Sequence, residues 1–458
     1  MSRVYPIFAQ NFVIPVYDLM RGTSRFRCGN VLKKTQWLSQ EKLEILQKKQ
    51  LHLLLQHAYD TVPYYHNLFR KKSLKPTDFR SIDDLSKIPV LTKDDIRNNS
   101  SDLLSKGYPQ SNLIRYRSGG TGNPIRFYIT KEQSSWEIAA EFRAYGWANY
   151  RLGDRCFMFW GSPIDKAKYK TMIGSFTKTL ERIQVSDSYL MSKENVSTYA
   201  DSLRVFNPEI VRGYTTSVLT VAKYLLENKD DFVRPKSVIT HAETLFDSDR
   251  KIIEEAFDCP VFDYYGSREI GAMAAECEEH CGYHISMENV LIELEKDGEH
   301  VAAGEKGAII ITSLRNFGMP FLRYRVGDIG VFSEEKCNCG RGLSLLSSIE
   351  GRVADFMTVY DKQKDQIVTV GPMYPFFEIA AMKIPIESYQ VIQEKIDEVV
   401  IKIVKGNGYS SKDTAFLLGY VNQVFGENVE VHIDFVDHIA PSASGKRSSF
   451  VSKVSSVY

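Results

Sequence analysis

The 458-residue chain lacks the features that mark several classes of protein. It has no uninterrupted apolar run of about 18–20 residues, the length that a membrane-spanning helix needs. Its 58 Lys and Arg residues nearly balance its 57 Asp and Glu residues, so the formal net charge is only +1. A nearly neutral protein has no general electrostatic attraction for nucleic acid. We therefore expect no nucleic-acid partner, and a ligand must be held by local chemistry.

The sequence also lacks an even set of cysteines. Its seven cysteines form no disulfide framework of the kind found in small secreted proteins. Four of them lie in two close pairs, Cys277 with Cys281 and Cys337 with Cys339. This pattern indicates a metal site in a reducing compartment, and we expect a cytoplasmic location.

The N-terminal segment is apolar but is interrupted by Gln10, Asn11 and Pro15. It has no small-residue cleavage signature, so we do not interpret it as a signal peptide. We favour a buried first helix or strand. The alternative is a weak contact with a membrane surface, made by Tyr17, Met20 and nearby arginines.

The length predicts more than one domain. Strand and helix patterns alternate from residue 156 to 265, which predicts an α/β fold with mainly parallel strands. The strands expected there are Cys156–Trp160, Glu209–Arg212, Ser237–His241 and Val261–Tyr265. We predict a large N-terminal domain over residues 1–355, with β-sheets flanked by helices. A small, mobile α+β C-terminal lid domain is predicted over 356–458, with strands in 388–403 and 428–436 and a helix near 411–425.

A glycine-rich loop, Ser118-Gly119-Gly120-Thr121-Gly122-Asn123-Pro124, stands between two segments of β-rich composition. Three glycines and two hydroxyls allow several backbone N–H groups and side-chain donors to face one anion. The spacings of a P-loop and of a dinucleotide fingerprint are both absent. On its own the loop is equally well explained as a β-turn of small residues.

Further motifs follow in a fixed order. They are Tyr264-Tyr265-Gly266-Ser267-Arg268-Glu269, Met319-Pro320-Phe321-Leu322-Arg323-Tyr324-Arg325-Val326-Gly327-Asp328, Gly351-Arg352-Val353-Ala354-Asp355 and Ser444-Gly445-Lys446. Together with the loop, this set resembles the adenylate-forming superfamily of acyl-CoA synthetases and related ligases. The nearest likeness is to the phenylacetate–CoA ligase-like branch, which includes ligase-like proteins of capsular polysaccharide biosynthesis. The resemblance extends over about residues 50–450.

The resemblance implies a role in ATP binding for each motif. Ser118, Gly119, Gly120, Thr121 and Gly122 would hold the phosphates of ATP. Glu269 would bind Mg²⁺, since a hard carboxylate suits a hard cation. Asp328 would accept hydrogen bonds from the ribose, and Arg352 would lie near the ribose or a phosphate. The rings of Tyr264 and Tyr265, with Gly266 and Ser267 beside them, would face the adenine.

A second segment departs from the branch. His241, Ala242 and Glu243 stand where the branch has a Gly-Ala-Glu-Pro-like stretch near the adenine and the acyl group. Histidine replaces the glycine, and Thr244 replaces the proline. The departure leaves the shape of the acyl site, and so the substrate, open.

Lys446 is the catalytic lysine that the resemblance implies. Its charge would neutralise the negative charge that builds on the α-phosphate and the carboxylate during adenylation. It lies in a small, hydroxyl-rich loop near the end of the chain, which suits a lid domain that swings in to deliver it. Asp355 would then lie near the hinge.

The cysteine pairs predict a structural zinc site, because thiolates with imidazole favour tetrahedral zinc. Between residues 277 and 284 the sequence offers Cys277, His280, Cys281 and His284 for two ligand places. Members of the branch with such a site use a Cys…His pair with a Cys-x-Cys pair, which implies Cys277 and His284 with Cys337 and Cys339. Cys281 is the alternative ligand.

The sequence therefore predicts a ligase that activates a carboxylate with ATP and Mg²⁺ and passes the acyl group to CoA or to an amine. The likeness to polysaccharide proteins makes an amine on a sugar an alternative acceptor. The competing hypothesis is a non-catalytic, zinc-stapled binding protein on a degenerate ligase scaffold.

Overall fold

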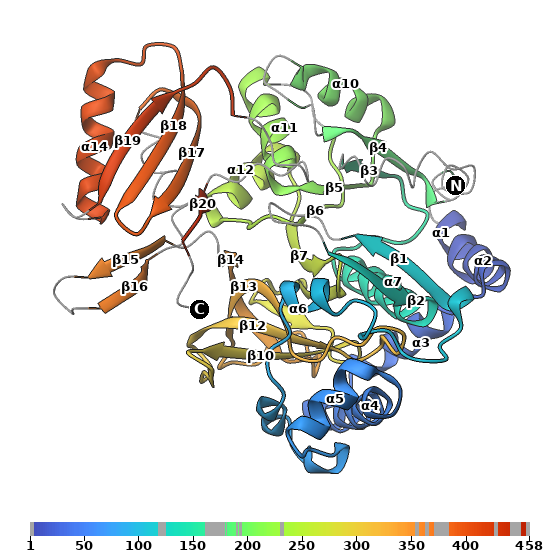
Figure 1. Cartoon of the computed structure of the whole chain (residues 1–458). Coiled ribbons are helices and arrows are strands. Elements are labelled where there is room, and N and C mark those ends of the chain that lie inside the picture. The colour runs from blue at the N-terminus through green and yellow to red at the C-terminus, as the bar shows by residue number, and fades with distance from the viewer. Residues whose placement is uncertain are drawn as a thin grey trace.

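A computed structural model describes residues 4–117, 125–160, 179, 181–188, 191, 195–229, 233–352, 357–361, 366–370, 384–425, 429–439 and 450–454. The predicted α/β class is confirmed (Figure 1). None of the described helices combines the length and the apolar character needed to cross a membrane.

One large sheet organises most of the described chain. Its twelve strands run in the spatial order β11 (Glu299–His300), β10 (Val290–Lys296), β12 (Lys306–Ser313), β13 (Tyr324–Phe332), β14 (Leu345–Arg352), β9 (Tyr283–Ile285), β8 (Gly271–Glu276), β7 (Val261–Ser267), β6 (Ser237–His241), β5 (Ile210–Tyr214), β3 (Cys156–Phe159) and β4 (Ile183–Ser186). The strands from β4 to β7 are parallel, and those from β7 to β11 are antiparallel.

The parallel half carries the strands that the sequence predicts. β6 has the expected bounds, and β7 continues two residues beyond the expected Tyr265. Every residue of β3, β5 and β6 is buried, as parallel strands covered on both faces require. The covering helices include α10 (Val196–Phe206), α11 (Thr215–Asn228) and α12 (Asp247–Phe257), whose apolar faces form one core with these strands.

The helices of the N-terminal half pack on the antiparallel strands. They are α3 (Arg25–Thr35), α4 (Gln40–Thr61), α5 (Pro63–Lys71), α6 (Lys93–Asn98) and α7 (Lys131–Trp147), with short 3₁₀ turns η2 (Pro76–Asp78), η3 (Asp83–Lys87) and η4 (Gln110–Asn112). Leu51, Leu54 and Leu55 of α4 share a core with Ile309 and Ile311 of β12. Burial of these side chains fixes α4 against the sheet.

The glycine-rich loop itself lies outside the described residues, but its flanks are described. β1 (Leu113–Arg117) and β2 (Arg126–Thr130) pair antiparallel, and Arg117 opposes Arg126 at the end next to the loop. The expected strand–loop–strand setting is therefore present. The next described element after β1 is strand β2, whereas a P-loop leads into a helix.

The C-terminal region forms a separate small α+β unit (Figure 1). Its sheet has the order β19 (Glu430–Phe435), β18 (Glu398–Lys405), β17 (Ile386–Lys395) and β20 (Phe450–Ser452), and α14 (Ser411–Phe425) packs on it. The segment 388–403 is a hairpin of two strands, because a turn at Ile396 and Asp397 reverses the chain. A two-stranded hairpin, β15 (Met357–Asp361) with β16 (Gln366–Val370), precedes it. The expected domain boundary at Asp355 falls outside the described residues.

The N-terminal segment is helical, but the expected burial is wrong. It runs through α1 (Val4–Phe8), the π-helical turn η1 (Ala9–Val13) and α2 (Ile14–Arg21). Large apolar side chains along it are exposed to solvent, among them Leu19 and Met20. The apolar composition alone could not reveal this exposure, because it fits a buried helix equally well.

Candidate active site and candidate metal centre

Three neighbouring parallel strands bring the predicted nucleotide residues to one edge of the sheet. β5 ends at Tyr214, β6 at His241 and β7 at Ser267, and all three carboxyl ends lie at this edge. In open α/β sheets, ligands bind outside the carboxyl ends of the strands. The topology therefore places Ala242, Glu243 and Glu269 next to the edge of the sheet where ligands bind in folds of this kind.

His241 is enclosed by aromatic rings. Its ring centroid lies 4.8 Å from that of Tyr264, 5.7 Å from that of Tyr145 and 5.7 Å from that of Trp160. Burial, with a contribution from the positive charge of Arg212, lowers the pKa of His241 well below its usual range. The imidazole is therefore neutral near pH 7, and it fills space that the glycine of the resembling branch would leave empty.

The two residues after His241 have distinct local roles. Ala242 has φ +67°, a left-handed conformation that is uncommon for a residue with a side chain. Glu243 holds the start of α11, because its Oε2 accepts a hydrogen bond of 2.8 Å from the Thr216 N–H. Such unusual backbone conformations gather at functional sites, where the surrounding structure holds them in place.

The turn between β7 and β8 depends on glycine and on Ser267. A side chain on Gly266 would put its Cβ 2.7 Å from the Gly271 carbonyl oxygen, so only glycine fits there. The Ser267 Oγ accepts a hydrogen bond of 3.2 Å from the Ile270 N–H. Glu269 lies inside this turn and is 7% exposed. The motif Tyr264–Glu269 therefore forms the well-defined end of the β7–β8 hairpin. The buried carboxylate of Glu269 lies within it.

The structure brings together three residues that lie far apart in the sequence. The Tyr265 hydroxyl donates a hydrogen bond of 2.7 Å to Oδ2 of Asp328. Asp328 in β13 is in turn the register partner of Arg352 in β14. The predicted adenine, ribose and phosphate residues thus converge from β7, β13 and β14.

Sequence reasoning missed a group of polar residues behind His241. The Arg212 guanidinium lies 4.1 Å from the centre of the Tyr145 ring, and its Nη2 is 3.3 Å from Oε1 of Glu141. Arg212 is 8% exposed, so its charge is held among aromatic rings and a carboxylate. No motif marks these residues, because strand β5 and helix α7 meet only through the tertiary fold.

Several predicted site residues cannot be placed. The phosphate loop 118–122, the hinge residue Asp355 and Lys446 all lie outside the described residues. Arg352 is placed by its backbone register alone. The described part of the candidate site therefore contains the residues that the sequence predicts for adenine, ribose and the acid.

The four predicted zinc ligands lie together. The ligand atoms of Cys277, His284, Cys337 and Cys339 are all within 4.8 Å of one another. Sγ of Cys277 lies 3.6 Å from Sγ of Cys337, and Sγ of Cys339 lies 3.3 Å from Nε2 of His284. The cluster joins the turn after β8 to the loop between β13 and β14.

This donor set fits a tetrahedral zinc ion. Zn–S bonds of about 2.3 Å in a tetrahedron put the two sulfurs about 3.8 Å apart, close to the 3.6 Å separation of Cys277 and Cys337. All seven cysteines are free thiols. Burial lowers the pKa of His284 to about 4, so its imidazole is neutral near pH 7, the form that ligates a metal. The alternative ligand Cys281 is exposed and is not part of the cluster.

A second group of potential metal ligands is already neutralised by an arginine. It consists of Glu293, Glu295 and His300. Arg323 forms ion pairs with both carboxylates, with Nε 3.1 Å from Oε1 of Glu293. The guanidinium occupies the place of a cation, so this group is a buried ion-pair network.

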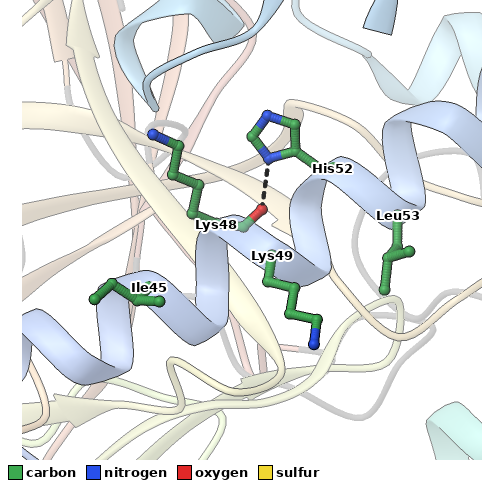
Figure 2. Close-up of a pocket in the computed structure, with 5 residues that line it drawn as sticks. All are labelled: Ile45, Lys48, Lys49, His52 and Leu53. Atoms are coloured by element: carbon green, nitrogen blue, oxygen red, sulfur yellow. Dashed lines mark hydrogen bonds between the residues drawn. The ribbon is translucent and has the colours of Figure 1, made fainter. Parts of the chain in front are cut away.

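An open hollow on the exposed side of α4 is distinct from both sites. Figure 2 shows Ile45, Lys48, Lys49, His52 and Leu53 on successive turns of this one helix, with His52 Nδ1 2.8 Å from the Lys48 carbonyl oxygen. A small-molecule site gathers polar groups from several elements. This hollow has no such convergence, and no predicted site residue lines it.

Comparisons with known proteins agree with this arrangement. The family model for the CapK C-terminal domain matches residues 361–453. Protein CapK of Staphylococcus aureus is 27% identical over 402 residues, which cover 85% of each chain. The phenylacetate-coenzyme A ligase of Thermus thermophilus is 27% identical over 76% of this chain and 80% of its own. A solved 2-hydroxyisobutyryl-CoA ligase has the same fold, with a TM-score of 0.69 at 17% identity over 92% of each chain.

The fold, the converging motifs and these relatives define the class: the chain is an adenylate-forming ligase. Its sequence is similar to protein CapK and to phenylacetate-coenzyme A ligases, and residues 361–453 match the model of the CapK C-terminal domain. The resemblance read from the sequence is thereby confirmed.

Proposed function

We propose that this protein uses ATP to activate a carboxylic acid as an acyl-adenylate and then transfers the acyl group to CoA or to an amine. The observation that carries the proposal is the convergence of Tyr265, Asp328 and Arg352 beside the carboxyl ends of the parallel strands. A carboxylate that accepts hydrogen bonds is suited to bind ribose hydroxyls. The tyrosine hydroxyl holds that carboxylate in place.

The proposed chemistry has two steps. A carboxylate oxygen of the acid attacks the α-phosphorus of ATP, and pyrophosphate leaves with the electrons of the broken P–O bond. The acceptor's thiol or amine then attacks the acyl carbonyl, loses its proton, and AMP leaves. Lys446 would stabilise the charge that develops in the first step, and the loop 118–122 would hold the phosphates. Glu269 would hold Mg²⁺, which neutralises phosphate charge.

The surroundings of His241 bear on the choice of acid. A neutral imidazole and the rings of Tyr145, Trp160 and Tyr264 occupy the region next to the expected adenine position. The relatives named phenylacetate-coenzyme A ligases suggest an aryl acid, whereas the added imidazole favours a smaller one. We propose a carboxylic acid smaller than phenylacetate.

The resemblance of the sequence motifs to ligase-like proteins of capsular polysaccharide biosynthesis favours a role in surface polysaccharide biosynthesis, with an amine on a sugar as one class of acceptor. The proposed zinc ion at Cys277, His284, Cys337 and Cys339 is structural. Four protein ligands complete a tetrahedron and leave no open position for a substrate.

The proposal is tested by incubating the protein with ATP, Mg²⁺ and one acid at a time, and by searching for the acyl-adenylate with mass spectrometry. We expect one chemical class of acid to give the adduct together with pyrophosphate. CoA and an amino sugar are then added to separate samples of that mixture. The compound that consumes the adduct is the acceptor. Tight ATP binding without an adduct from any acid would instead support a non-catalytic binding protein.

A further inference from the structure

The helical run α1–η1–α2 carries an exposed apolar face that the ligase chemistry does not use. It consists of Ile7, Phe8, Phe12, Val16, Leu19 and Met20. Leu19 is 86% exposed and Met20 is 79% exposed. The run lies at the edge of the molecule (Figure 1). Contiguous exposed apolar surface on a soluble domain marks a site of interaction.

The spacing of these residues places them on one side of the run. Phe8, Phe12, Val16 and Met20 follow each other at intervals of four, which in a pure α-helix would drift slowly around the axis. The π-helical turn Ala9–Val13 takes up extra residues per turn and offsets that drift. The rings of Phe8 and Phe12 stack with their centroids 5.2 Å apart. The six side chains therefore form one continuous face.

The opposite side of the run is held firmly to the protein. Pro6 and Ala9 are buried. Asp18 is also buried, and it accepts hydrogen bonds from the Phe26 N–H at 2.8 Å and from Nε of Arg25 at 3.0 Å. The helical run is therefore fixed to the rest of the protein on one side and exposes its apolar face on the other side.

Basic residues predominate in the segment that carries this face. Residues 1–37 contain six basic residues, Arg3, Arg21, Arg25, Arg27, Lys33 and Lys34, and a single acidic one, Asp18. Asp18 is already paired with Arg25 inside the protein. Arg21, Lys33 and Lys34 are exposed, and exposed Arg27 has Glu132 3.9 Å away. The whole chain carries only +1, so this excess is local.

We propose that α1–η1–α2 docks this protein on the surface of an anionic phospholipid membrane. The apolar face would enter the region between headgroups and acyl chains, and the flanking cations would contact lipid phosphates. A second copy of the chain suits the face less well, because pairing it with itself would bring the same basic residues together. The run would lie along the surface, since it does not meet the requirements of a spanning helix.

The test measures binding of the full-length protein to phosphatidylcholine vesicles with and without phosphatidylglycerol, by co-sedimentation. We expect binding that requires phosphatidylglycerol and weakens as salt is raised. Leu19→Glu should weaken that binding by at least about tenfold, because it removes one large inserted side chain and adds a repelled charge. Acyl-adenylate formation in the absence of vesicles should be unchanged.

The matched control is Val205→Glu, which changes an apolar residue of α10 that is 88% exposed. It should bind vesicles as the unchanged protein does. Absence of binding to any vesicle would overturn the proposal, and so would equal losses in the two variants. A dimer in solution that Leu19→Glu converts to a monomer, without vesicle binding, would identify the face as a self-association surface instead.

Discussion

At the scale of single residues, the hydrogen bond between Tyr265 and Asp328 is the best-defined part of the candidate nucleotide site. A tyrosine hydroxyl that donates to a carboxylate fixes the direction of that carboxylate, and a carboxylate can accept several hydrogen bonds. The 2.7 Å distance is that of a strong bond. This orientation is consistent with the role proposed for Asp328, which is to accept hydrogen bonds from a ribose.

Replacing Tyr265 by phenylalanine removes this bond and keeps the aromatic ring. We expect Tyr265→Phe to raise KM for ATP about tenfold, which corresponds to about 1.4 kcal/mol, with a smaller effect on kcat. Steady-state kinetics with varied ATP measure it. Tyr283→Phe is the matched control, because its hydroxyl also donates to a carboxylate, at 2.9 Å to Asp263, which is not one of the proposed nucleotide residues. An equal change of KM in both variants would contradict a specific role for Tyr265.

The side chain of His241 should affect which acid the protein prefers. We expect His241→Gly to raise kcat/KM for an aryl-acetic acid, relative to that for a small aliphatic acid, by about tenfold or more, since even one methylene in an apolar site is worth about that much. Comparing the two acids on the same variant separates selectivity from general damage. If both values fall in proportion, His241 does not limit the acyl site.

At the scale of elements, the cysteine cluster connects two segments that also carry the candidate active site. One is the hairpin of β7 and β8, whose turn holds Glu269, and the other is β13, which holds Asp328, with the loop that follows it. A metal bound there would hold the end of β8 and strand β9 to the loop that follows β13. Loss of the metal should therefore lower the stability of the fold directly. It should lower ligase activity only by displacing active-site residues.

We expect the purified protein to contain about one zinc ion per chain, as a single tetrahedral site requires. Cys337→Ser should remove most of it and lower the melting temperature, because a structural metal contributes its binding free energy to folding. Metal analysis by mass spectrometry and thermal unfolding measure the two effects.

Cys281→Ser is the control for that experiment, since Cys281 is exposed and outside the cluster. This variant should keep both its zinc and its melting temperature. Zinc loss from Cys281→Ser, with zinc retained in Cys337→Ser, would overturn the ligand set.

The elements also show what could be predicted from sequence. The strand Ser237–His241 was predicted with its observed bounds because a short β-branched run stands between clear helical segments. The zinc ligands followed from a metal-like spacing within two short segments. Arg212 and Glu141 left no such signal, because 71 residues separate them and only packing brings them together. The outward face of α1–η1–α2 was missed because an apolar stretch does not reveal which side will be covered.

At the scale of the whole molecule, the account requires two bodies to cooperate. The large sheet carries the residues proposed to bind adenine, ribose and the acid, and the catalytic lysine is expected from the small C-terminal unit. That unit has its own core, which includes Val391, Ile401, Leu417 and Phe450. A unit with its own core can move as one body, as delivery of a distant lysine requires.

The central claim is adenylation, and Lys446 tests it most directly. The measurement is carboxylate-dependent exchange of labelled pyrophosphate into ATP, in the unchanged protein and in Lys446→Ala. We predict that exchange falls about 10²–10³-fold, the usual effect of removing a group that stabilises transition-state charge, while the Kd for ATP changes little.

Lys453→Ala is the matched control, because Lys453 is a nearby lysine whose Nζ already pairs with Glu394 at 2.6 Å. This control should keep its exchange activity. Exchange that depends on the acid and is lost only in Lys446→Ala is the predicted result. Exchange that persists at the same rate in Lys446→Ala, or that no acid elicits in the unchanged protein, would contradict the account.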